Sequence, residues 1–247
     1  MGDAVRVVQQ SAAPRSPVVR RPGRPRPAGR PARWRQARLT RRMVQLYAGL
    51  LLYGVSMALL VRSSLGVMPW DVLHQGLAGQ LGWSLGAVTV LVGTLVLLAW
   101  VPLRQRPGLG TVSNVLVIGL AVDGALALLP AVEALPGRVA LAVAGIALNA
   151  VATAAYIGVH LGPGPRDGLM TGLVRRTGRS VRLVRTCIEI AVVALGWALG
   201  GTLGVVTVAY ALAIGPLVHL LLPLLSVRVP GRGDRGSLTG RSVPGAR

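Results

Sequence analysis

Six long apolar runs dominate the pattern of hydrophobic and polar positions along the chain. Each is close to the roughly 20 residues that an α-helix needs to cross about 30 Å of hydrocarbon. Between them, the segments 65–80 and 161–178 are too polar and too rich in Gly and Pro to span. The pattern therefore predicts an all-α membrane protein with six transmembrane helices, at residues 43–61, 85–103, 109–130, 139–160, 181–202 and 203–225.

An internal repeat relates the two halves of the apolar region. A shift of 96 positions aligns residues 65–84 with residues 161–180 without a gap, and nine of these twenty positions are identical. The same register continues through the third and sixth apolar runs. Each copy holds three spanning helices, an odd number, so the second copy must enter the membrane in the opposite sense. We therefore expect two inverted three-helix repeats, 43–130 and 131–225, an architecture found in many secondary transporters.

The repeat contains one motif with a local structural meaning, LGxxPxD. Gly permits a sharp turn, Pro is favoured at the first helical position, and an Asp in the first turn suits the helix dipole. A helix of about a dozen residues that starts at each Pro is about 18 Å long, which is too short to cross. Such a helix is either re-entrant, with its N-terminus offered to an anionic ligand, or interfacial. The motif residues are Gly66, Pro69 and Asp71 in the first copy and Gly162, Pro165 and Asp167 in the second.

One ionisable residue, Asp123, falls inside the third apolar run, where an ionised carboxylate needs a partner or water. The repeat makes His219, in the sixth run, its counterpart. An acid and an imidazole at equivalent depths can serve in a proton relay. The alternative is a protonated Asp123 that hydrogen-bonds to a neighbouring helix, with His219 near the lipid boundary.

Arginine supplies all the positive charge of the chain. All 27 basic residues are Arg, 12 of them precede Met43, and the formal net charge is +20. Residues 1–42 and 226–247 show no apolar period, so we expect two disordered tails. Arg-rich loops stay on the cytoplasmic side, which predicts both termini inside and only Arg62 and Arg138 outside. We expect the N-terminal tail to contact anionic lipid headgroups rather than any specific nucleic acid.

The sequence offers little catalytic or metal-binding chemistry. Cys187 is the single cysteine, so the chain has neither an intrachain disulfide nor a multi-Cys metal site. His74 and His160 have no cluster of carboxylates around them in the sequence, and no GxSxG, P-loop or HExxH motif is present. Arg185 and Glu189 are four residues apart and should form a structural ion pair on one helix face. We expect no enzymatic activity, no metal and no cofactor.

Four stretches of the sequence are similar to a known group of proteins. The stretches SSLGVMPWDVLHQGL, VPLRQRPGLGTVSNVLVIGLAVD, HLGPGPRDGLMTGLVRRTG and ALAIGPLVHLLLP resemble the YczE branch of the YczE/YyaS/YitT group of bacterial integral membrane proteins. The resemblance covers about residues 43 to 225. It implies a multi-pass protein of the bacterial cytoplasmic membrane whose biochemical role is poorly defined, with a permease-like role as one interpretation, and it assigns no catalytic residue.

Two hypotheses about function follow. The first is a small-molecule permease whose pocket lies between the repeats, bordered by the segments around the motif aspartates, Asp123 and His219. The second is a non-transporting membrane factor that supports or regulates another protein, because duplication also builds bundles without a substrate path. Six spans make a narrow bundle, which makes a homodimer an alternative to the monomer.

Overall fold

The chain forms a bundle of eight helices in the part that the computed structural model describes, residues 32–227, and this part contains no strand. Side chains are described from Leu39 onward. The helices are α1 (Ala32–Ser63), α2 (Pro69–Leu81), α3 (Leu85–Ala99), α4 (Leu109–Leu128), α5 (Leu135–Gly158), α6 (Pro165–Thr177), α7 (Val181–Ala198) and α8 (Val205–Leu225).

The two predicted tails fall mostly outside the described residues, at 1–31 and 228–247. The boundary of the first tail differs from the prediction, since α1 begins at Ala32 and residues 32–42 are helical. This stretch follows the last proline of the Pro-rich segment and contains Arg, Gln and Leu, which are good helix formers. The apolar run of the following residues therefore extends backwards as one continuous helix.

The two short helices predicted from the LGxxPxD motif are confirmed. Each has 13 residues and carries its Pro in the first turn, Pro69 in α2 and Pro165 in α6. Each ends at a glycine in the left-handed region, Gly82 and Gly178, both with φ of 66°. Because a left-handed residue closes a helix at low cost only when it lacks a Cβ, these glycines set the length of both helices.

Equivalent structural features recur 96 positions apart. Helices α2 and α6, α3 and α7, and α4 and α8 start at residues separated by this offset. The positive φ values also recur in this way, including the uncommon non-glycine pair Ser64 (50°) and His160 (54°). The sequence register is therefore also a structural register.

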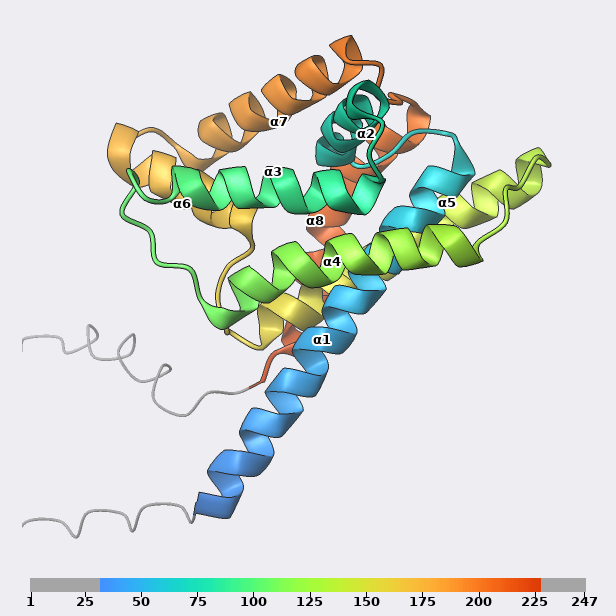
Figure 1. Ribbon diagram of the computed structural model, residues 1–247. Coiled ribbons are helices and arrows are strands. Elements are labelled where there is room, and N and C mark those ends of the chain that lie inside the picture. The colour runs from blue at the N-terminus through green and yellow to red at the C-terminus, as the bar shows by residue number, and fades with distance from the viewer. Residues whose placement is uncertain (1–31, 228–247) are drawn as a thin grey trace, which may run out of the picture.

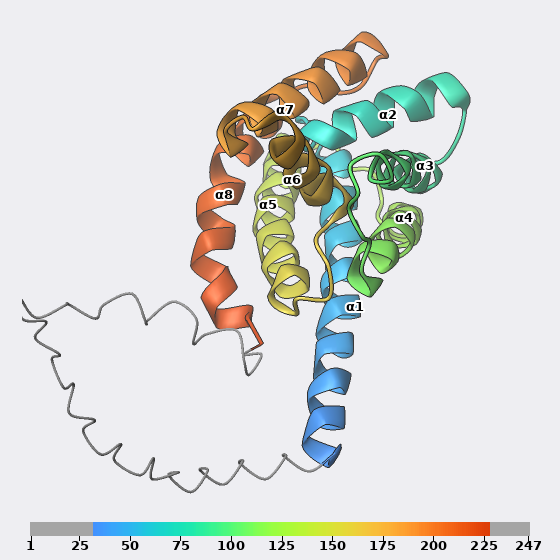
Figure 2. The same cartoon turned by 90° about the vertical axis from the view of Figure 1, so that its left-hand side faces the viewer.

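Helices α1 and α5 form the centre of the bundle and run antiparallel (Figures 1 and 2). They approach closely because each has a glycine at the crossing. A Cβ on Gly49 would lie 3.2 Å from the Ala152 carbonyl oxygen, and a Cβ on Gly145 would lie 3.3 Å from the Ser56 carbonyl oxygen. Gly145 is the counterpart of Gly49, and Ser56 is the counterpart of Ala152, so each helix makes the same contact with the other.

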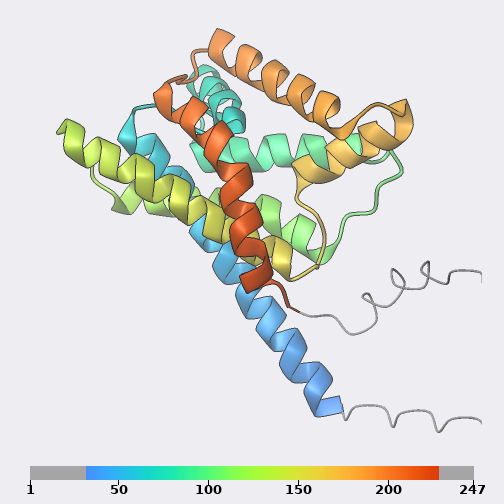
Figure 3. The same cartoon turned by 180° about the vertical axis from the view of Figure 1, so that it is seen from behind.

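The other helices surround this pair. Helix α4 packs on α1 and α8 packs on α5, on either side of the central pair (Figure 2). Helices α2, α3, α6 and α7 gather at one end of the bundle, as Figure 3 shows from behind. In this group α2 lies against α7, and α3 lies against α6. The halves therefore meet through α1 with α5, α2 with α7 and α3 with α6, while α4 and α8 each pack mainly within their own half.

Four helices of the described chain, rather than six, are long and apolar enough to cross a membrane: α1, α4, α5 and α8. The expected span at 85–103 is shortened, because α3 has only 15 residues and meets α2 at a bend of 114°. The expected span at 181–202 carries Arg182, Arg185 and Glu189 in α7. The prediction of six spans is therefore not confirmed, and neither is the side on which each terminus lies.

The two halves differ where their third and fourth helices meet. Helix α3 packs on α4 at Gly86 and Gly119, where a Cβ on Gly86 would clash with the Gly119 carbonyl oxygen. The equivalent residues in α7 and α8 are Arg182 and Gly215. A Cβ on Gly215 would meet no atom within 4 Å. The close α3–α4 contact therefore has no counterpart at this position between α7 and α8.

These equivalent glycines offer a matched test. We expect Gly119→Ala to lower the melting temperature of the protein, because its Cβ would lie 2.5 Å from Val90 Cγ2 and 2.8 Å from the Gly86 carbonyl oxygen. Overpacking of this kind costs about 1 to 3 kcal/mol. Gly215→Ala, in open space and within a helix, should leave the melting temperature unchanged or raise it slightly. Thermal unfolding of both variants in the same detergent measures the difference, and equal losses would contradict the packing described.

A cavity between the two halves

A cavity of about 430 Å³ lies where the two halves meet. Helices α1 to α8 all contribute to its wall or to its immediate rim. Ten pairs of lining residues stand 96 positions apart, among them Pro69 with Pro165 and Ile118 with Ile214. The cavity is therefore bordered by equivalent positions of both halves. Its volume falls within the range of small-molecule sites in proteins.

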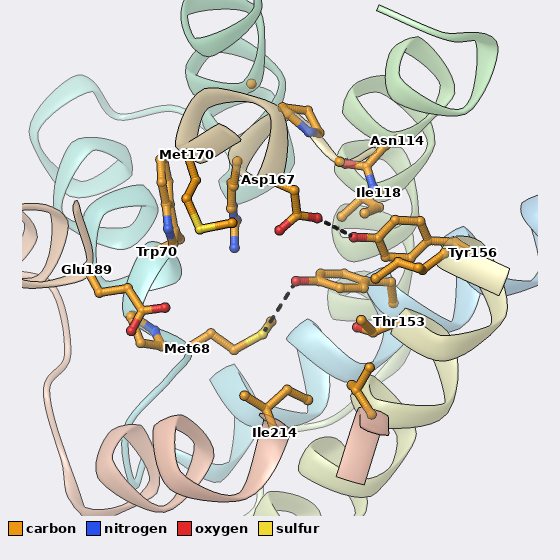
Figure 4. A pocket seen from close by; sticks show the side chains of 18 of the residues that line it. Met68, Trp70, Asn114, Ile118, Thr153, Tyr156, Asp167, Met170, Glu189 and Ile214 are labelled. Atoms are coloured by element: carbon orange, nitrogen blue, oxygen red, sulfur yellow. Dashed lines mark hydrogen bonds between the residues drawn. The ribbon is translucent and has the colours of Figure 1, made fainter. Parts of the chain in front are cut away.

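Figure 4 shows the side chains that surround the cavity. Asp167 and Tyr156 point toward each other on one side, and Met68 and Glu189 lie on the opposite side. Ile214 closes the cavity from below in this view. The wall is mixed, with apolar side chains over most of its area and a few polar groups that converge from different helices, which is the usual composition of a small-molecule site.

The first turns of α2 and α6 form the polar part of the wall. The Arg166 guanidinium lies over the ring of Trp70, 4.8 Å from its centroid, and its Nη2 is 3.7 Å from Oδ1 of Asp71. Asp71 is fully buried, and its Oδ1 also lies 3.1 Å from Nδ1 of His74. The other carboxylate oxygen of Asp71 has no hydrogen-bond partner among the described residues. Arg166 is thus held by a stacking contact and an ion pair from the other half.

Asp167 is the counterpart of Asp71 and has a different environment. Its Oδ2 lies 3.5 Å from the hydroxyl of Tyr156, a long hydrogen bond, and the residue lines the cavity. Burial raises the pKa of the Asp167 carboxyl, an effect that the guanidinium groups of Arg166 and Arg185 oppose. Asp167 therefore takes up a proton more readily than an exposed aspartate.

The second charged pair on the wall is the one expected from the sequence. Arg185 Nε donates to Glu189 Oε1 at 2.9 Å, both on α7 and both partly exposed to solvent. Their counterparts in α3, Thr89 and Gly93, also line the cavity but carry no charge. Because Arg185 and Glu189 neutralise each other, they add little net charge to the cavity.

The predicted site residues separate into three groups in the structure. Pro69, Pro165 and Asp167 line the cavity, whereas Asp71 lies behind its wall. The glycines of the motif serve the fold, since a Cβ on Gly66 would lie 2.8 Å from Thr207 Oγ1, and a Cβ on Gly162 would lie 2.7 Å from Thr111 Oγ1. Both have positive φ, 119° and 135°.

The third group is the predicted pair Asp123 and His219, which the structure does not bring together. Asp123 makes the α3–α4 contact, because its Oδ2 accepts from Ser84 Oγ at 2.6 Å and its Oδ1 accepts from the Gly86 backbone N–H at 2.7 Å. Asp123, on α4, therefore accepts a hydrogen bond from a backbone N–H in the first turn of α3, which has no acceptor within its own helix. His219 lines the cavity instead, in α8. Among the described residues no hydrogen bond or ion pair joins the two.

Several residues of the cavity were not singled out from the sequence. Neither Arg166 nor Trp70 is among the site residues that the sequence predicts. In the structure Trp70 is 9% exposed and lies within the protein. The signal that could have found them is the repeat itself, since Trp70 and Arg166 are counterparts within the one motif that both copies keep. Tyr53 and Tyr156 carried no such signal.

The cavity extends along one face of α8, whereas the equivalent face of α4 does not line it. Gly215, Val218, His219 and Leu222 line it, whereas none of their counterparts in α4 does. No group of three or more His, Cys, Asp or Glu side chains in the described chain could hold a metal ion.

A difference in side-chain size accounts for the open side. At the end of α3, Trp100 fills the space against α6, where its Nε1 donates to the Pro165 carbonyl oxygen at 3.0 Å and its ring covers Gly168. The equivalent residue of α7 is Gly196, on which the backbone of Val72 and Leu73 in α2 lies directly. Helix α7 therefore lies close to α2 and away from α8.

Comparison with known proteins places the chain in a family. Residues 40–223 match a family of unknown function, DUF6198. The chain belongs to this family. An uncharacterized protein of Haemophilus influenzae is 40% identical over 185 residues, which cover 75% of this chain and 84% of that protein. The uncharacterized membrane protein YczE of Bacillus subtilis is 29% identical over 72% of this chain and 83% of its own length. The uncharacterized protein YyaS of the same organism is 23% identical over 76% and 96%. No solved structure matches the chain.

These relatives confirm the resemblance that the paired PWD and GPRDGLM segments indicated. The relative named YczE is described as a membrane protein, which agrees with the four long apolar helices of this chain. This family member is therefore a helical membrane protein. The family description assigns no activity, so the function has to be argued from the cavity.

The hydrogen bonds of Asp123 predict the effect of removing it. We expect Asp123→Ala to lower stability by about 1 to 2 kcal/mol, because it leaves the Ser84 hydroxyl and the Gly86 N–H without their acceptor. Thermal unfolding in detergent checks this, with Glu133→Ala as the control in an exposed loop. If the two variants melt at the same temperature, Asp123 does not hold α3 to α4.

Proposed function

We propose that this protein is a small-molecule permease of the bacterial cytoplasmic membrane and that the cavity between its halves is the substrate site. One observation carries the proposal. The cavity is lined by residues from equivalent positions of both halves, so it lies at the position where secondary transporters with repeated halves bind their substrates. A bundle that served only as a scaffold would have no reason to leave this central space unfilled.

The proposal includes an inverted relation between the halves. Arg42, near the start of the apolar part of α1, donates to the Val159 carbonyl oxygen just after α5 at 2.9 and 2.7 Å. Its counterpart Arg138, near the start of α5, donates to the Ser63 carbonyl oxygen at the end of α1 at 2.7 Å. Two antiparallel helices that make the same contact at opposite ends are what an in-plane twofold axis produces.

The difference between the halves supports an alternating mechanism. In this structure Gly86 and Gly119 close the α3–α4 contact, whereas α7 and α8 leave the cavity open beside Gly215. Transporters of this architecture expose their site by moving one repeat against the other. We assign this structure to a state in which the cavity is closed between α3 and α4 and open between α7 and α8. We place both termini in the cytoplasm, as the arginine distribution predicts.

Accessibility of the cavity to water tests the proposal without knowledge of the substrate. In a Cys187→Ser background, we expect single cysteines at Ala211 and at its counterpart Val115 to react with a water-soluble maleimide, because both positions line the cavity. Leu212, which is 73% exposed on α8 and does not line the cavity, is the matched control and should stay unreactive in lipid. Labelling of membrane vesicles in both orientations measures the reaction.

Two results would contradict the permease. If neither cavity position reacts from either side, the space is closed to water and the alternative of a non-transporting membrane factor is favoured. If both positions react from the same side under all conditions, the site opens to one side only. A reactive Leu212 would show that the labelling does not discriminate lipid from cavity.

A further inference from the structure

The charged group of the cavity with most unused hydrogen-bonding capacity is Arg166. Among the described residues its guanidinium has an ion pair with Asp71 at 3.7 Å and a stacking contact with Trp70, but it donates no hydrogen bond to any protein acceptor. A guanidinium carries five N–H donors in a fixed fork. The Arg166 side chain is 30% exposed and lines the cavity. Its donors are therefore available to a molecule in the cavity.

The other charged groups of the wall are engaged or buried. Glu189 accepts from Arg185 at 2.9 Å, and Asp71 lies behind Arg166 with no exposed area. Asp167 is the remaining carboxyl, and burial raises its pKa. An anionic ligand would thus find a positioned arginine with unused donors, whereas the carboxyls of the wall are paired in Glu189, buried in Asp71 or hydrogen-bonded to Tyr156 in Asp167.

The surroundings of Arg166 are apolar and aromatic. Val92 of α3, Ile188 of α7 and Ile214 of α8 line the cavity on the faces around it. Tyr53 contributes a hydroxyl that makes a long contact, 3.9 Å, with Met68 Sδ. A ligand with a charged end and a small apolar body would bury its body here and place its charge on Arg166.

We infer that the cavity binds an organic anion, a monocarboxylate with a small apolar body, and that Arg166 binds its carboxylate. The inference rests on the proposed function, since it names the substrate class of the same site. Arginine pairs with a carboxylate through two parallel hydrogen bonds, a geometry that Trp70 favours by holding the guanidinium plane. A phosphate ester is disfavoured, because its second charge would lie near Asp167 and Glu189 without a second free arginine.

The binding test uses ligands that share a body and differ in charge. Purified protein in detergent is titrated by calorimetry with benzoate, benzamide and benzylamine, and with octanoate and indole acetate as monocarboxylates of other shapes. We expect at least one monocarboxylate to bind, and benzamide and benzylamine not to bind. Arg166→Gln should weaken binding by about ten- to hundredfold, the value of a charge-assisted hydrogen-bond pair. Arg166→Lys should recover part of this loss.

The control is Arg182→Gln, because Arg182 is exposed on α7 and does not line the cavity. It should leave affinity unchanged. Preference for benzylamine, undiminished carboxylate binding in Arg166→Gln, or no binding by any monocarboxylate would each overturn the inference. The cysteine labelling described above does not depend on the ligand, so the permease proposal would stand or fall separately.

The carboxyl beside Arg166 predicts a pH dependence of binding. A bound anion repels an ionised Asp167, so the anion and a proton on Asp167 favour each other. Because burial already raises the pKa of this carboxyl, affinity should increase as the pH falls through that pKa. The charged or titratable groups that act on it directly are Arg166 on its own helix, Tyr156 on α5 and Arg185 on α7. The other titratable residues that line the same cavity are Glu189, His74, Tyr53, Tyr210 and His219, and Asp71 lies behind Arg166.

Benzenesulfonate separates this effect from titration of the ligand, since it stays anionic throughout. We expect its affinity to rise in the wild-type protein as the pH is lowered and to stay flat in Asp167→Asn. Calorimetry at several pH values, in buffers of different ionisation enthalpy, also counts the protons taken up. A pH dependence that persists in Asp167→Asn would assign the proton to another group and overturn this part of the inference.

Discussion

The structure depends on contacts that each half makes with the end of the other half. Arg42 bonds to the carbonyl groups that follow α5, and Arg138 bonds to those at the end of α1, where the last turn of a helix leaves acceptors without an intrahelical donor. The same exchange holds α4 and α8, since the Gly110 N–H donates to Leu161 O at 3.0 Å and the Val206 N–H donates to Leu65 O at 3.1 Å. Neither half can satisfy these helix ends alone.

The same exchange determines where the cavity forms. The segments that begin at Leu65 and Leu161 lead directly into α2 and α6, so fixing them brings the first turns of both short helices to the line between the halves. Once these first turns are in place, small differences between the two copies determine the shape of the cavity. Trp100 fills the space between α3 and α6, whereas Gly196 lets α7 lie on α2 and leaves α8 uncovered. Two equivalent backbones with different side chains therefore leave α3 packed on α4 but α7 separated from α8 beside the cavity.

Much of the frame could be predicted from the sequence, because local rules and a repeat decide it. Pro69 and Pro165 begin helices for reasons contained in one turn, and the offset of 96 holds for helix starts and backbone dihedrals alike. Hydropathy was less informative about spans. It treats 85–103 as continuous, but α3 ends at Ala99, with a Trp cap that packs on another helix. That boundary depends on a tertiary contact and has no local signal.

The site was harder to predict, because its residues are chosen by partners rather than by sequence neighbours. The repeat correctly made Asp123 and His219 counterparts, but counterparts meet only if both lie close to the axis. Asp123 instead accepts hydrogen bonds at the start of α3, within its own half. Equivalence in a repeat therefore predicts equal depth and not contact. Contact requires knowledge of which positions face the axis.

Trp70 and Arg166 are counterparts that do meet, and this meeting explains why the two copies differ there. In a duplicated protein with identical halves, a residue on the axis packs against its own copy, so an arginine would face an arginine and a tryptophan a tryptophan. Two guanidinium groups at this distance would repel in a region of low dielectric. With Trp in one copy and Arg in the other, the same geometry becomes a cation–π stack. Asp71, next to Trp70 in the chain, then balances the charge of the arginine from behind, and Arg166 lines the cavity. Trp in one copy and Arg in the other thus replace a like pair by a cation–π stack and leave a single arginine at the cavity wall.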